Sequence, residues 1–102
     1  MTNTPPIDLL TFGQFSGRIG EEFVVEEAGV PAVALKLIQA TPLRNFANVP
    51  REPFSLIFAG PLDLILPQRM YPLRHVALGL QSIFLVPIGK DTEKVSYQAI
   101  FN

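Results

Sequence analysis

The chain has 102 residues, which suits one domain, so we expect a single domain over 1–102 in which residues 1–7 form a flexible lead-in. Apolar residues make up 48% of the chain and charged residues 17%, the composition of a folded globule whose surface is partly apolar. The absence of cysteine excludes disulfides and thiolate chemistry, and the net charge of −1 does not favour nucleic acid as a partner.

The start of the chain does not resemble a secretory signal peptide. Residues 1–6 contain no basic residue and are not followed by an apolar run. No apolar stretch approaches the roughly 18 residues that a membrane helix needs. We therefore expect a protein without a signal peptide or membrane partner, which is cytoplasmic or part of an assembled particle.

The only helix signal lies close to the N-terminus. Thr11 precedes Gln14 by three residues, the spacing of a capping box, and Gly20 is a natural end. We expect a short helix that docks on the rest of the fold as a lid over one end of a barrel. Its apolar stripe, spaced at three to four residues, consists of Leu9, Phe12, Phe15 and Ile19.

After the helix, apolar and polar residues alternate with a period of two, which is typical of strands. The pattern predicts six strands near 21–27, 32–41, 54–59, 71–76, 81–86 and 97–101, with the prolines between strands or near their ends. The polar run 89–94 makes the last two strands a hairpin. We therefore expect a mainly β domain, a small antiparallel six-stranded barrel or sandwich with one short N-terminal helix. The strand aromatics expected in its core are Phe54, Phe58, Phe84 and Phe101.

Charges are unevenly distributed along the sequence. Residues 1–27 carry five acidic residues against one arginine, a net of −4, and residues 28–76 carry five basic residues against two acidic ones, a net of +3. These charges are either ordinary solvated strand faces and loops, or a bipolar surface that favours head-to-tail self-association or a charged partner. The sequence leaves both interpretations open.

No pattern of catalytic residues is recognisable. His75, the only histidine, stands beside Arg74 on a strand, and we expect a surface or satisfied structural residue. The sequence lacks a nucleophile elbow, a phosphate-binding loop and a calcium loop. Glu22 and Glu26 would lie about 13 Å apart on one strand, too far to share an ion. We therefore expect no catalytic residue, no metal site, no cofactor and no enzymatic activity.

Two connections, 42–53 and 60–69, are longer than hairpins need. Long loops can close the end of a barrel or carry a binding site. In the first case Phe46 and the leucines of the second loop plug the barrel ends. In the second case the loops hold the residues that contact a partner, which are Arg44, Phe46, Arg51, Gln68, Arg69 and Tyr71.

Several segments of the second half form a recognisable string: 53–61, 66–71, 84–89 and the final Tyr-Gln-Ala-Ile-Phe-Asn of 97–102. They resemble an uncharacterised family of short bacterial proteins that end in a Tyr-x-Ala-x-Phe-Asn strand and are encoded near phage tail-collar-like proteins. The resemblance covers nearly the whole chain. It implies a structural or assembly role in a phage-tail-like or filamentous particle, and it supplies no catalytic residues.

We therefore predict a non-enzymatic structural or protein-interaction module, whose partner is a second copy or the product of a neighbouring gene. We expect its last strand at a sheet margin, where a neighbour could add a strand. One alternative is a small-ligand-binding or enzyme domain with its site in the barrel mouth between the two long loops. The other is a nucleic-acid-binding barrel, which we do not expect because the strand aromatics are not interleaved with lysine and arginine.

Overall fold

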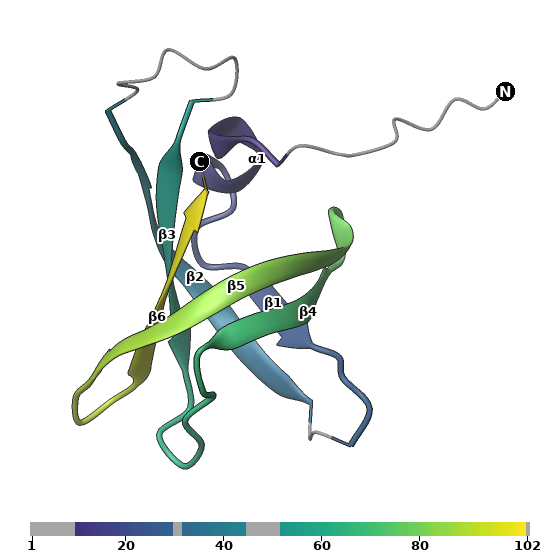
Figure 1. The fold of residues 1–102 in the computed structure, drawn as a ribbon, viewed down its shortest axis with the longest axis vertical. Helices are drawn as coiled ribbons and strands as arrows, with labels where there is room; N and C mark the ends of the chain where they lie inside the picture. The colour runs from purple at the N-terminus through teal and green to yellow at the C-terminus, as the bar shows by residue number, and fades with distance from the viewer. Residues whose placement is uncertain (1–9, 30–31, 45–51, 102) are drawn as a thin grey trace, which may run out of the picture.

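The structure, a computed structural model, describes residues 10–29, 32–44 and 52–101. In these residues one short helix accompanies six strands that close into an antiparallel barrel in the order β1-β2-β3-β6-β5-β4 (Figure 1). The predicted mainly β fold is confirmed, and the barrel is the correct one of the two expected architectures. The elements are α1 (Phe12–Ser16), β1 (Glu22–Val25), β2 (Val33–Pro42), β3 (Phe54–Gly60), β4 (Arg69–His75), β5 (Gly79–Lys90) and β6 (Val95–Phe101).

Two long strands, β2 and β5, change partner along their length. The first part of β2 pairs with β1 and the second with β3, and the register shifts between Leu37 and Gln39. Similarly, β5 pairs with β4 as far as Leu85 and then with β6, with a shift between Pro87 and Gly89. A bulge bends a strand and increases its twist, so each long strand can curve around the barrel. The predicted end of the fifth strand at 86 is therefore wrong, because the bulge lets the strand continue past Pro87.

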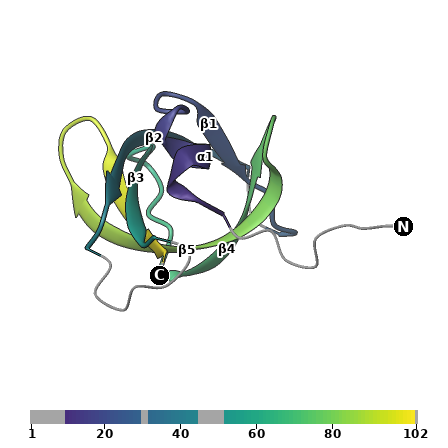
Figure 2. The ribbon, with the colours of Figure 1, turned by 90° about the horizontal axis from the view of Figure 1, so that it is seen from above.

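The helix covers one end of the barrel, as predicted. In the view from above, α1 lies within the ring of strands (Figure 2). Phe15 is fully buried, with its ring 6.0 Å from that of Phe23 and 5.8 Å from that of Phe54. The predicted stripe extends too far, because α1 ends at Ser16 and Ile19 is exposed. Leu9 lies outside the described residues.

The other end of the barrel is closed by the connection between β3 and β4. Leu66 is buried there, and Leu62 and Leu64 pack against the core. The leucines therefore plug this end, which confirms the first of the two interpretations of the loop. Phe46, the other expected plug, lies outside the described residues.

The last strand does not lie at a sheet margin. β6 is flanked by β3 and β5, and its pairing with β3 extends to Phe101. The prediction of an edge at the chain end is wrong because closure of the barrel gives β6 a neighbour on both sides. Strand addition at β6 therefore loses its structural basis.

Gly60, at the end of β3, is a position where only hydrogen fits. A Cβ built there would lie 2.9 Å from Cδ2 of Leu35 and 3.0 Å from Cε1 of Tyr97, two fully buried side chains. We expect Gly60→Ala to lower the free energy of unfolding by about 1–3 kcal/mol, because an overpacked core must shift. Urea unfolding followed by tyrosine fluorescence measures this change.

Gly13 provides a control of opposite sign. It lies in α1, is exposed, and has nothing within 4 Å of a built Cβ. We expect Gly13→Ala to be neutral or to stabilise the protein by up to about 1 kcal/mol, because glycine loses more backbone entropy in a helix. Equal effects of the two substitutions would contradict the close packing at Gly60.

Candidate functional site

His75 is buried, with 2% of its surface exposed, and stacks on Phe23 with ring centroids 4.6 Å apart. Its Nδ1 accepts backbone N–H groups from Ala77 and Leu78 at 3.0 and 3.1 Å. The ring proton therefore resides on Nε2, which donates to Glu21 Oε1 at 2.6 Å. Nδ1 thus holds the turn between β4 and β5, and Nε2 connects this turn to Glu21, the residue before β1. His75 is a satisfied structural residue, one of the two predicted roles, and the surface role is wrong.

The Glu21 carboxylate contacts both His75 and a second basic side chain. Its Oε1 accepts the hydrogen bond from His75 Nε2 and also lies 3.6 Å from an Arg18 guanidinium nitrogen. Over residues 10–29, 32–44 and 52–101, no group of three or more histidine, aspartate or glutamate side chains could hold a metal ion. The contacts of His75 and Glu21 therefore form a hydrogen-bonded turn with a neighbouring ion pair.

The acidic and basic segments of the sequence meet along the seam between β1 and β4. This seam is short, with Val24 opposite Arg74 and Val25 opposite Leu73. Just beyond it, Glu26 pairs with Arg74 at 2.8 Å and Glu27 with Arg69 at 2.7 Å. Much of the charge asymmetry is therefore neutralised within the chain. Of the two interpretations, solvated strand faces fit these residues better than a bipolar surface.

The predicted partner-binding residues lie at two distant places. Arg44 is exposed and follows β2, whose last residue pairs with the first residue of β3. Gln68 and Arg69 are exposed at the start of β4, beyond the other end of β3. The described ends of the first long connection, at Arg44 and Glu52, thus lie at the opposite end of the barrel from the second connection, 60–69 (Figure 1). Phe46 and Arg51 lie outside the described residues.

Tyr71, the remaining predicted residue, is buried and has a structural role. The Arg69 guanidinium lies 4.5 Å from the centre of its ring, and its hydroxyl donates to the Pro67 carbonyl at 2.5 Å. The hydroxyl of Tyr97 accepts the Leu66 N–H at 2.9 Å. Both tyrosines of the chain therefore fasten the same loop between β3 and β4. Burial raises the pKa of the Tyr71 hydroxyl above its usual value.

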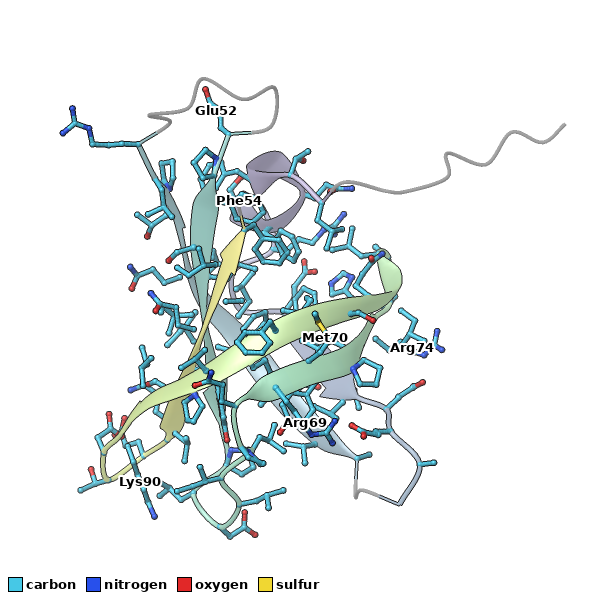
Figure 3. The ribbon with its side chains drawn as sticks, in the orientation of Figure 1. Glu52, Phe54, Arg69, Met70, Arg74 and Lys90 are labelled. Carbon is cyan, nitrogen blue, oxygen red and sulfur yellow. The ribbon has the colours of Figure 1, made fainter. Side chains whose placement is uncertain are left out.

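Large apolar side chains lie on the outer side of β4 and β5. Met70 and Phe84 stand opposite each other across the two strands and are 52% and 44% exposed. Leu80 is exposed on the same side, opposite Arg74. Figure 3 shows Met70 in front of the β5 ribbon, on the outside of the barrel. We call Met70, Leu80 and Phe84 the outer apolar face.

The prediction of Phe84 as a core residue is wrong. Phe54 and Phe58 are fully buried and Phe101 packs partly against the core, as expected. In β5, however, the buried positions are Ile83 and Leu85, which turns Phe84 outward. Residues 83–86 are all apolar, so this segment gives no sequence signal for which phase faces inward.

A groove of about 1030 Å³ lies on the outer side of β2 and β3. Its lining includes small residues, among them Ala34, Ala59 and Gly60, and the loop that follows β3. No sequence pattern indicates this hollow, because alanine and glycine in strands predict neither burial nor binding. Four charged side chains at the groove have no hydrogen bond or ion pair within the described part of the chain, and they are Glu22, Lys36, Asp63 and Glu93.

These features define a small closed β-barrel whose interior is filled with side chains and whose outer side carries an apolar face and a hollow. A family model described as a domain of unknown function, DUF6916, matches residues 10–101, so the chain belongs to that family. The comparison with curated proteins finds no match, and neither does the comparison with solved structures. Among the described residues, no helix has the length and apolar character needed to cross a membrane.

The tyrosine anchors give a prediction for the loop at the β3–β4 end. We expect Tyr97→Phe to lower the free energy of unfolding by about 1–3 kcal/mol, because the buried Leu66 N–H loses its acceptor. Thermal unfolding followed by circular dichroism measures the loss. Gln98→Ala, at the adjacent outward position of β6, should change stability by less than about 0.5 kcal/mol. An unchanged stability of Tyr97→Phe would show that this hydrogen bond does not hold the loop.

The raised pKa of Tyr71 gives a pH prediction. Tyrosine titrates near 10 when unfolded, and burial favours the neutral hydroxyl in the folded state. The stability contributed by Tyr71 is therefore complete below about pH 10 and is lost as the pH rises through the higher folded pKa. The phenolate absorbance of the wild type minus that of Tyr71→Phe isolates this group. A difference curve with its midpoint at or below pH 10 would contradict the burial argument.

Proposed function

We propose that this chain is a non-enzymatic protein-interaction module that joins a larger assembly through its outer apolar face. The observation that carries the proposal is the cross-strand pair of Met70 and Phe84, exposed on two paired strands. Burying one such side chain at a contact contributes about 1.5–3 kcal/mol. Aromatic anchors of this kind dominate the binding energy of protein interfaces.

The outer apolar face lies on strands whose other side is packed in the core, which favours binding without rearrangement. Tyr71, Ile83 and Leu85 alternate with Met70 and Phe84 and are buried in the core. The exposed side chains thus project from strands that are fixed from behind, so little conformational entropy is lost when a partner docks.

The borders of the face have the charge distribution of an interface. Arg74 lies on the same outer side of β4 as Met70, with 50% of its side chain exposed, whereas Arg69 packs over the ring of Tyr71. Interfaces commonly have an apolar centre and a polar rim, and arginine is enriched in them.

The filled interior supports the non-enzymatic part of the proposal. The buried polar residues among those described are Ser55 and His75, and both nitrogens of the histidine are engaged in hydrogen bonds. A general base must have a free lone pair within reach of the proton that it removes. His75 does not meet this requirement in the described arrangement.

The kind of assembly is proposed from the sequence resemblance. The similar short proteins are encoded near phage tail-collar-like proteins, which supports a phage-tail-like or filamentous particle as the assembly. The partner is then a second copy of the chain or the product of a neighbouring gene. The outer apolar face is suited to either, because apolar contacts do not depend on one particular partner.

Replacing Phe84 tests the proposal. We expect Phe84→Ser to weaken association at least tenfold, which corresponds to about 1.4 kcal/mol. Light scattering over a range of concentrations detects self-association, and co-purification with each co-expressed neighbouring-gene product detects another partner. Ile65→Ser is the matched control, because Ile65 is 51% exposed but lies in the loop between β3 and β4. This control should associate like the wild type.

Two results would refute the proposed function. One is a wild type that stays monomeric and binds none of the neighbouring-gene products. The other is equal weakening by Phe84→Ser and Ile65→Ser, which would remove the special role of the face. The unfolding temperature of each variant verifies that the barrel is intact.

A further inference from the structure

We infer that the outer apolar face of one copy docks into the groove of a second copy, so that the chain associates head to tail. The inference rests on the proposed function, and it adds the identity of the partner and the surface that receives the face. Three properties of the described residues support it: the positions of the two surfaces, their shapes and their charges.

The two surfaces lie on opposite sides of the barrel. In the closed order β1-β2-β3-β6-β5-β4, β2 stands three places from β5, and β3 stands three places from β4. In the view from above, β4 and β5 lie on one side of α1 and β1 and β2 on the other (Figure 2). A contact between different surfaces of two copies leaves one surface of each kind unused. Further copies can then add to form a row or a closed ring.

The shapes of the surfaces are complementary. Phe84 and Met70 project from the outer apolar face. The groove is hollow where Ala34, Ala59 and Gly60 lack large side chains, and its volume of about 1030 Å³ exceeds the need of two inserted side chains. Pro61, Leu64 and Ile38 add apolar surface to the lining. An aromatic side chain in a pocket of this kind has the geometry of an interface anchor.

The charges are complementary as well. At the groove, three carboxylates (Glu22, Asp63 and Glu93) and the Lys36 ammonium group have no partner among the described residues, whereas the second lysine of the lining, Lys94, is paired with Asp91. Arg74 stands opposite Leu80 on the side of the outer apolar face, and its Nε lies 2.8 Å from Glu26 Oε1. A guanidinium has five N–H donors, so it can bind a second carboxylate while the first pair persists.

A symmetric contact between two outer apolar faces is less favourable. It would bring Arg74 of one copy near Arg74 of the other and offer neither a carboxylate beyond the Glu26 with which it is already paired. It would also leave the charged side chains of the groove unused. In the head-to-tail contact, the outer apolar face of one copy enters the groove of the next. Arginine then meets the carboxylates of the groove.

Two variants with one blocked surface each test the inference. Phe84→Asp removes the projection and retains the groove. Ala34→Arg fills the groove and repels incoming arginines, while it retains the outer apolar face; Ala34 is exposed on β2, so the barrel has room for the change. Each variant alone should be monomeric by analytical ultracentrifugation. An equimolar mixture should form a 1:1 heterodimer and nothing larger, because one intact face meets one intact groove.

Val76→Asp is the control for an added charge on the β4–β5 hairpin. Val76 is 96% exposed in the turn, outside the outer apolar face. This variant should associate like the wild type, with its dissociation constant changed less than threefold. Wild-type masses that continue beyond the dimer, or that correspond to a ring, support the head-to-tail contact without any variant.

Three results would overturn the inference. The first is a mixture of the two blocked variants that stays monomeric while the wild type associates. The second is a wild type that stops at the dimer, which indicates a symmetric contact. The third is a monomeric wild type that binds a neighbouring-gene product through Phe84. This last result would leave the proposed function intact, whereas loss of all association would refute both.

Discussion

Closure of the barrel is the constraint on which the other features depend. The sheet closes through β1 and β4, yet these strands share the shortest pairing, with two pairs of opposite residues. Closure therefore requires β2 and β5 to curve far enough to bring β1 and β4 together, and each of them contains a register shift. Once closed, the ring directs one set of side chains inward, where Phe23, Phe58 and Tyr97 fill the interior. Because side chains fill the interior, the side chains of the barrel that a partner could contact lie on its outer surface.

The distribution of charge follows from the same closure. Glu26 and Glu27 leave β1 beside Arg74 and Arg69 of β4, so segments of opposite charge in the sequence become neighbours. Exposed ion pairs add little stability, typically below about 1 kcal/mol. Their effect on the surface is larger, because they neutralise the seam and leave the unpartnered carboxylates concentrated at the groove. The uneven charge of the sequence therefore reflects the pairing of β1 with β4. The carboxylates without partners lie at the groove.

Local patterns predicted the fold better than they predicted the surfaces. The Thr11–Gln14 spacing located the start of the helix, and Thr11 N–H donates to Gln14 Oε1 at 2.8 Å. The period of two located six strands. The orientation of Phe84 could not be predicted, because its neighbours are apolar on both sides. The anchoring of Leu66 by Tyr97 joins residues 31 positions apart, and the groove combines small residues of β2 and β3 with a loop, so both depend on tertiary structure.

Closure also limits how this protein can associate. An open sheet offers unpaired backbone groups at its margins, and a neighbour can bind by adding a strand. Here β6 pairs on both sides, and no strand of the ring in the described residues is without two neighbours. A partner of the described barrel would therefore contact side chains on the outside of the strands, where surface shape and composition matter most. Phe84 is exposed because side chains alternate along β5 and Ile83 and Leu85 face the core, so the packing that fills the core also places Phe84 outside.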